Sequence, residues 1–116
     1  MRLLHIACLC VGIIAAAALM PHQAICADSS SVVTVKAESG HFNPPQLEVT
    51  AHQPFKVRVI SAEKSPIEFE SFELRRERVV QPGEAITVNM PALGPGTYKF
   101  FDDFHRDTPE GVIVAK

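Results

Sequence analysis

Cysteine is scarce in this sequence and is confined to its N-terminal end. The 116 residues include three cysteines, Cys8, Cys10 and Cys26, and no tryptophan. All three belong to a segment that we expect to be removed, so the remaining chain would have no thiol. The absence excludes a disulfide framework and a thiolate-bound metal from that remaining chain.

An excess of basic residues is also absent. From residue 28 onward, ten lysines and arginines stand against thirteen aspartates and glutamates, which gives a net charge of −3 with neutral histidines. Neither a basic stripe nor an RNA- or DNA-binding motif occurs in the sequence. We therefore expect no nucleic-acid partner.

The N-terminal segment has the pattern of an export signal. Met1-Arg2 gives a basic start, an apolar, alanine-rich run extends to residue 19, and a proline follows before Ala27. A retained membrane anchor is the alternative, but this run is shorter than the roughly 20 residues that span a bilayer. We predict a signal peptide at residues 1–27, cleaved after Ala27. Residues 28–116 would then form one periplasmic domain with no stable membrane span.

Short β-prone runs separated by turns fill this expected domain. Phe55, Val57 and Val59 alternate with polar residues and would share one buried face. Residues 71–77 are compatible with a helical turn or an irregular crossover. Strands with turn signals every ~8–12 residues predict an all-β fold, an antiparallel β-sandwich. The predicted strands cover residues 32–37, 47–50, 55–60, 67–70, 79–80, 86–88, 97–101 and 112–114.

The most unusual segment lies between the last two predicted strands. It contains Asp102, Asp103, His105, Asp107 and Glu110 within nine residues. A solvated turn needs one or two polar residues, whereas five ionisable side chains of these types suit a metal ion. The segment therefore predicts a metal site.

Several motifs together resemble the cupredoxin-like family. The resemblance covers residues 32–115 and is greatest to the small periplasmic domains that accompany bacterial iron permeases, including the N-terminal domain of the EfeO type. It implies a Greek-key antiparallel β-sandwich with a metal site at one end. The motifs are Phe42-Asn43-Pro44, Leu47-Glu48-Val49, Glu68-Phe69-Glu70, Val79-Val80-Gln81-Pro82-Gly83, Leu93-Gly94-Pro95-Gly96-Thr97-Tyr98, and the final loop with Gly111.

The sequence departs from blue-copper members of this family at their metal ligands. Such a member would have a histidine at Ile67, a cysteine at Asp102 and a methionine at Pro109, and only the histidine at His105 is kept. A blue site needs a thiolate and two imidazoles, so we expect no type-1 copper. Carboxylates favour Fe(II)/Fe(III), or Cu(II) held by oxygen and one or two imidazoles.

The candidate metal ligands are the carboxylates and histidines near this loop. The resemblance places Asp102 at the cysteine position, spaces His105 from it as a ligand, and implies a ligand role for Glu68. For Asp102 the alternative is an Asx-type turn, and Asp103 suits a solvated loop equally well. The candidate set is Glu68, Asp102, Asp103, His105, Glu70 and His41.

The outer members of this set have ordinary alternatives. Glu68 and Glu70 flank Phe69, so both point away from the core face, where Glu70 suits solvent. For His41 the alternative is an exposed turn histidine. Glu77 is expected to pair with a neighbouring arginine on the surface.

Three functions follow from these observations. The first is a periplasmic component of ferrous-iron uptake that binds iron or copper and assists Fe(II) oxidation for a membrane iron permease, beside another periplasmic iron-binding protein. The chain shows no electron acceptor, so an enzymatic role stays open. The second is a copper or iron carrier or chaperone without redox turnover. The third is a β-sandwich interaction module without a metal, and analogy of fold does not choose among them.

Overall fold

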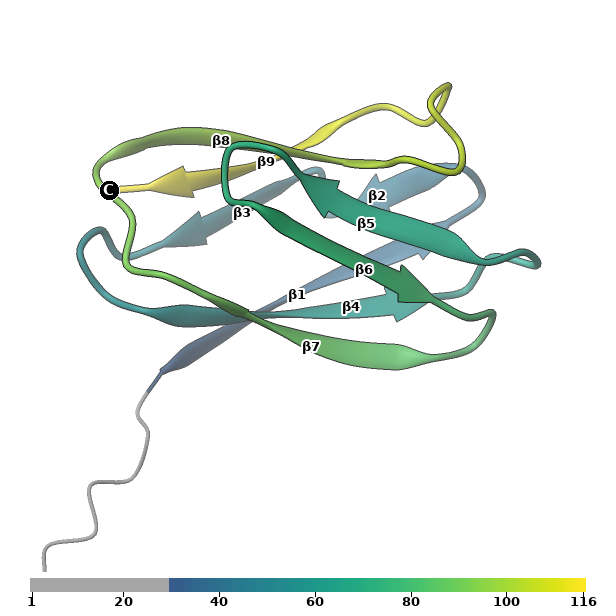
Figure 1. Ribbon diagram of the computed structural model, residues 1–116, viewed down its shortest axis with the longest axis horizontal. Helices are drawn as coiled ribbons and strands as arrows, with labels where there is room; N and C mark the ends of the chain where they lie inside the picture. Colours follow the sequence, from purple (N-terminus) through teal and green to yellow (C-terminus); the bar gives the residue numbers. More distant parts are fainter. Residues whose placement is uncertain (1–29) are drawn as a thin grey trace, which may run out of the picture.

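The computed structural model describes residues 30–116, which form two β-sheets that face each other (Figure 1). No helix occurs among these residues, and so none that is long and apolar enough to cross a membrane. The predicted signal peptide lies outside them. The strands are β1 (Ser31–Glu38), β2 (His41–Asn43), β3 (Gln46–Val49), β4 (Phe55–Ser61), β5 (Ile67–Ser71), β6 (Arg76–Val80), β7 (Ala85–Met90), β8 (Gly96–Asp102) and β9 (Gly111–Ala115).

The two sheets contain both parallel and antiparallel strand pairs. One sheet has the order β2-β1-β4-β7 and the other has the order β3-β9-β8-β5-β6. The pairs β1/β4 and β3/β9 are parallel, whereas the other pairs are antiparallel. The predicted all-β sandwich is confirmed, but the pairing is mixed rather than wholly antiparallel. The chain passes from the first sheet to β3 in the second sheet and then returns to the first sheet as β4. This crossover makes β4 run parallel to β1.

The core lies between the sheets and follows the predicted alternation. Phe55, Val57 and Val59 on β4 are all buried, at 2% exposure or less. The ring of Phe100 packs against Phe42 in the facing sheet and against Phe69 in its own sheet, with ring centroids 5.0 and 5.2 Å apart. Such aromatic contacts are among the largest contributions of apolar area to a small core.

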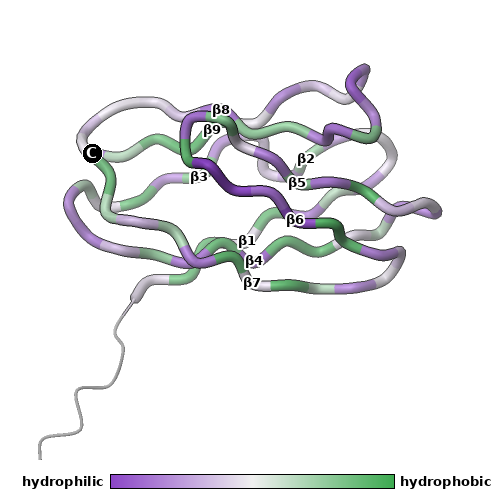
Figure 2. The backbone as a smooth tube through the Cα atoms, in the orientation of Figure 1, coloured by the Kyte–Doolittle hydropathy of each residue, from purple (hydrophilic) through white to green (hydrophobic). Residues whose placement is uncertain are grey.

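The region between β5 and β6 differs from its prediction. Residues 72–75 form a tight turn, and β6 begins at Arg76, three residues before the predicted strand. The two strands therefore form a hairpin instead of a helical turn or a crossover. β6 is an edge strand that starts with the charged residues 76–78, a hydrophilic stretch in Figure 2, so its sequence lacks the alternation that would have indicated a strand.

A close contact fixes the end of the loop between β8 and β9. Gly111 pairs with Phe100 across the two strands, and a Cβ atom at this glycine would overlap the Phe100 ring. Phe100 is fully buried and cannot move aside without disturbing its neighbours. The loop that was predicted to bind a metal is thus fixed by core packing at Gly111, where β9 begins.

Candidate metal centre

Asp102 is buried and makes hydrogen bonds through both carboxylate oxygens. Its side chain is 3% exposed. Oδ1 accepts hydrogen bonds from the backbone N–H groups of Glu68, at 2.9 Å, and Phe104, at 3.1 Å, and Oδ2 lies 2.7 Å from His105 Nδ1. The bond from Phe104 forms the Asx-type turn that was the alternative to a ligand role. Asp102 therefore organises the loop, and its role as a ligand stays a prediction.

His105 faces a small pocket at the end of the sandwich. Its Nδ1 atom is held by Asp102, while Nε2 lies 3.3 Å from the hydroxyl oxygen of Ser65. A carboxylate beside one imidazole nitrogen fixes the ring orientation and leaves the other nitrogen for a ligand or a proton. The pocket has a volume of about 170 Å³ and is lined by Gly40, Glu63, Ser65, Asp102, His105, Asp107 and Thr108.

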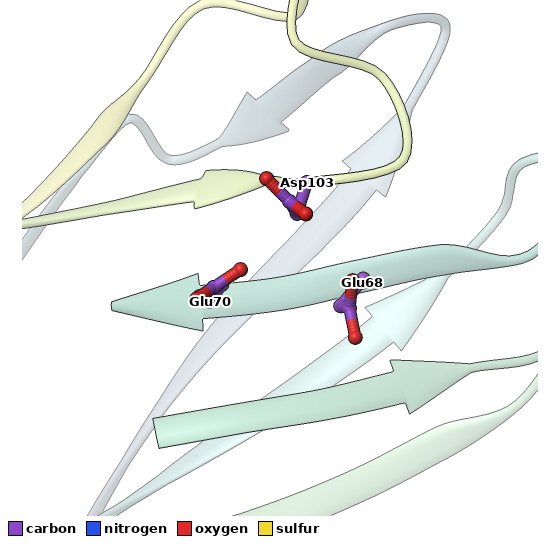
Figure 3. A group of neighbouring side chains, drawn as sticks. All are labelled: Glu68, Glu70 and Asp103. Atoms are coloured by element: carbon purple, nitrogen blue, oxygen red, sulfur yellow. The ribbon is translucent and has the colours of Figure 1, made fainter. Parts of the chain in front are cut away.

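A second group of acidic side chains lies on the outer face of the β5/β8 pair. One carboxylate oxygen from each of Glu68, Glu70 and Asp103 lies within 4.8 Å of the others (Figure 3). The backbone N–H of Asp103 donates to the carbonyl of Glu68 at 3.0 Å, which continues the pairing beyond the end of β8. Within residues 30–116 this is the only group of three histidine, cysteine or acidic side chains that could hold one ion.

The alternation of side chains along β8 separates the two groups. Asp102 pairs with Phe69, a core residue, and directly opposed residues in an antiparallel pair share a face. Asp102 therefore points inward, whereas Glu70 pairs with Phe101 on the outer face. Asp103, the next residue after Asp102, lies on the outer side with Glu68. The candidate ligands thus form two groups instead of the single predicted one.

His41 belongs to neither group. It is exposed on β2, and its Nδ1 atom lies 2.9 Å from the backbone carbonyl oxygen of Ser39. This arrangement matches the alternative of an exposed histidine beside a turn, and a ligand role for His41 stays a prediction.

The pKa values of Glu68 and Glu70 are raised by burial and by acidic neighbours. Burial of Glu68, which is 8% exposed, is the largest cause of its raised pKa; a hydrogen bond with Glu77 and the charges of Glu77, Asp103 and Glu70 add to it. The pKa of Glu70 is raised by burial, then by Asp103 and Glu77, and the charge of Arg106 opposes this rise. A multivalent cation would relieve this repulsion, and its binding would release protons.

Glu77 was missed as a neighbour of this group. It was expected to pair with an arginine, but it lies opposite Glu70 across the β5/β6 hairpin and contributes to the raised pKa of Glu68. The register of the hairpin determines this placement. A hairpin turn at residues 72–75 would have predicted this placement. The charged sequence around that turn gave no recognisable strand pattern.

Arg106 supplies a positive charge beside the cluster and was not predicted to do so. Its Nη1 atom lies 3.3 Å from Asp103 Oδ1. Its guanidinium carbon also lies 3.9 Å from the centroid of the Phe101 ring. The side chain therefore combines an ion pair with a cation–π contact.

Comparison with known proteins identifies the family. A profile of the family described as "Cupredoxin-like domain" matches residues 8–115. An uncharacterized protein of Rickettsia prowazekii (strain Madrid E) is 34% identical over 88 residues, which are 76% of this chain and 70% of that protein.

Solved structures share the fold at low identity. Auracyanin A, described as a "blue" copper protein from Chloroflexus aurantiacus, is 15% identical with a TM-score of 0.60, over 76% of this chain and 100% of that one. The metal-binding domain of a Cu(I)-exporting P-type ATPase from Streptococcus pneumoniae, solved with Cu(I), is 16% identical with a TM-score of 0.62, over 73% of this chain and 84% of that one.

The donor atoms of this chain do not fit a blue-copper centre. Such a centre needs a cysteine thiolate and two imidazoles, and residues 30–116 contain no cysteine. Asp102 already accepts hydrogen bonds at both oxygens, and Ile67 is a buried core residue. Carboxylate oxygens and one imidazole suit a harder ion. With a family profile that matches almost its whole length, the chain belongs to the cupredoxin-like domain family.

Proposed function

We propose that this protein works in the periplasm as an iron-binding component of ferrous-iron uptake, and that it binds iron, or copper, at Glu68, Glu70 and Asp103. The observation that carries the proposal is the approach of these three carboxylates to within 4.8 Å on one face of the sheet. Hard oxygen donors suit iron and Cu(II) better than Cu(I).

The same donor set favours the oxidised state of iron. A trivalent ion gains more from anionic oxygen than a divalent ion does, because the Coulomb energy scales with the ion's charge. The reduction potential of the bound iron would therefore be lowered, which makes loss of one electron from Fe(II) easier. The electron would pass to dioxygen, to Cu(II) or to a redox partner protein. The protein would then assist oxidation without itself storing the electron.

The proposed partners follow from this role. The iron would be passed to a membrane iron permease, with another periplasmic iron-binding protein in the same system. Removal of residues 1–27 would release the domain into the periplasm, where the cluster on the outer face of the sheet could meet both.

A second candidate function is copper carriage without redox turnover, which the His105 pocket favours. Asp102 fixes the ring so that Nε2 faces the pocket, where Glu63 and Asp107 supply further oxygens. An imidazole with carboxylates suits Cu(II). Solved copper-binding proteins of the same fold, such as auracyanin A, make this candidate worth a separate test.

Calorimetric titration of the exported protein separates these candidates. The triple variant Glu68→Gln, Glu70→Gln and Asp103→Asn should abolish tight binding of Fe(II) under anaerobic conditions. The matched control replaces Glu38, Glu48 and Glu84 by glutamine, which changes the net charge equally at sites away from the cluster. His105→Ala should affect Cu(II) alone if copper is the cargo of the pocket.

The outcomes distinguish all three functions. Unchanged Fe(II) binding by the cluster variant would refute the proposed iron site. If the unmodified protein bound no metal, the β-sandwich interaction module would be the remaining candidate function. For the redox step, dioxygen uptake in the presence of Fe(II) should be faster with the protein than with the cluster variant, and equal rates would leave a carrier without turnover.

A further inference from the structure

Arg106 connects the acidic cluster to an aromatic pair on the same face. Its guanidinium lies against Asp103 and over the ring of Phe101. Phe101 in turn makes an edge-to-face contact with Phe72, with the ring centroids 4.8 Å apart. Phe101 is 5% exposed although it lies on the outer face, and Arg106 and Phe72 both lie against it.

The position of Arg106 makes it a competitor for the ion. Asp103 belongs to the three-carboxylate cluster, and its Oδ1 atom accepts a hydrogen bond from the Arg106 guanidinium. An ion held by Asp103 must share this carboxylate with Arg106 or displace it. The side chain of Arg106 is 53% exposed, so displacement would bury no new charge and would meet little steric resistance. Exposed pairs of this kind are weak enough to exchange readily.

Resting on the proposed iron site, we propose that Arg106 is a resident counter-ion of the cluster that lowers its affinity for cations, and lowers it more for trivalent than for divalent ions. A positive charge near the site repels any bound cation, and this repulsion scales with the charge of the ion. The carboxylates alone favour Fe(III) strongly, so an uncorrected site would hold the oxidised ion too tightly for delivery. Arg106 therefore allows release of the cargo.

Two separate contacts keep the planar guanidinium at this position. Binding of a metal ion would break at most one of them. When Asp103 turns to an ion, Arg106 keeps its stacking position on Phe101, because that contact does not involve the carboxylate. The positive charge consequently stays beside the cluster after the ion has bound. Phe101 is thus a positioning residue for Arg106.

The test is the affinity of the exported protein for two redox-inert probes, Zn²⁺ and Ga³⁺ with a competing chelator. Arg106→Gln should raise the affinity for Zn²⁺ about fivefold and that for Ga³⁺ about tenfold at low salt. In about 1 M salt, where the screening length is about 3 Å, both increases should fall below about twofold. Arg106→Lys keeps the charge and should stay within about twofold of the unmodified protein.

Arg58→Gln is the matched control, since it removes one positive charge from an exposed position on β4 in the other sheet. It should leave both affinities unchanged. If Arg106→Gln and Arg58→Gln bind the probes equally while the unmodified protein binds them through the cluster, the role of Arg106 is refuted and the iron site stands. If the triple cluster variant binds the probes as well as the unmodified protein does, both proposals fail.

A structural readout is independent of affinity. In ¹⁵N-labelled protein at low temperature, the side-chain Nη1–H signal of Arg106 should carry the ring-current shift of Phe101. On Zn²⁺ addition it should lose the effect of the Asp103 hydrogen bond and keep the ring-current shift, and Phe101→Leu should abolish that shift. A signal that does not change with Zn²⁺ would overturn the competition between Arg106 and the ion.

Discussion

Asp102 and Asp103 are neighbours in the sequence, but their carboxylates lie on opposite sides of the second sheet. Asp102 points inward and holds His105, whereas Asp103 points outward beside Glu68 and Glu70. The difference follows from the alternation of side chains along a strand. It divides the acidic loop into a part that determines the fold of the loop and a part that lies on the outer face of the sheet.

Replacing the two aspartates by asparagine should therefore have different effects on stability. Asp102→Asn keeps an oxygen for the N–H groups of Glu68 and Phe104, but it places an amide NH₂ group or a weaker acceptor against His105. A buried hydrogen bond of this kind is worth about 1–3 kcal/mol, so the free energy of unfolding should fall by about that amount. Urea denaturation monitored by circular dichroism measures it.

Asp103→Asn serves as the control in the same experiment. Its carboxylate is 43% exposed and its loss removes both a repulsion from Glu70 and a pair with Arg106. The free energy of unfolding should stay within about 0.5 kcal/mol of the unmodified protein. Equal effects of the two variants would contradict the division of the loop.

The acidic cluster should make the metal-free protein less stable as the pH rises. The pKa values of Glu68 and Glu70 are raised above the ordinary value of 4.5 by burial and by their acidic neighbours. Well below pH 4.5 these groups are protonated in the folded and the unfolded protein alike. As the pH rises through the raised pKa values, the unfolded state loses protons more readily than the folded state does, so this contribution to stability is lost.

Glu68→Gln and Glu70→Gln together should therefore flatten the fall in stability above pH 4.5 and raise the urea midpoint at pH 7. Midpoints from pH 4 to pH 8 in the presence of a chelator test this. Glu38→Gln with Glu84→Gln is the control at exposed positions. A double cluster variant that loses stability at pH 7 would show that these carboxylates do not repel one another.

Much of the fold could be predicted from local patterns. The alternation in residues 55–60 and the apolar runs on both sides of the acidic loop correspond to β4, β8 and β9. Residues 71–77 could not be assigned, because a charged edge strand carries no apolar face. The parallel pairs β1/β4 and β3/β9 join strands distant in sequence, and no local pattern specifies them.

The residue types of the candidate site could be predicted, but their grouping could not. Glu68 and Glu70 were placed on the outer face because Phe69 lies between them, and the structure confirms this. Which of Asp102 and Asp103 would join them depends on the register between β5 and β8. Glu77 and Arg106 enter the site through the β5/β6 hairpin and through the loop conformation, which the sequence alone does not determine.

Gly111 should be intolerant of any side chain. Because a Cβ atom here would overlap the ring of Phe100, Gly111→Ala should lower the free energy of unfolding by about 1–3 kcal/mol through overpacking. Gly94→Ala is the matched control, since a Cβ atom there would meet only the Tyr98 hydroxyl at an ordinary contact distance of 3.9 Å. Thermal melts of both variants measure the difference, and similar melting temperatures would contradict the close packing at the end of the loop.

Binding of an ion to the cluster should stabilise the protein, and its removal should reverse the effect. An ion that binds only the folded state adds about 2.7 kcal/mol at a concentration of 100 times its dissociation constant. We expect this increase to grow as the pH rises above 4.5, because the raised pKa values of Glu68 and Glu70 make protons compete with the ion at lower pH. Thermal melts with Zn²⁺, and then with a chelator, measure the increase and its loss.

The variant with Glu68→Gln, Glu70→Gln and Asp103→Asn should show neither, whereas His105→Ala should show both, because His105 lies outside the outer group. If His105→Ala alone abolished the stabilisation by Zn²⁺, the binding site would be the pocket beside Asp102 instead of the outer group.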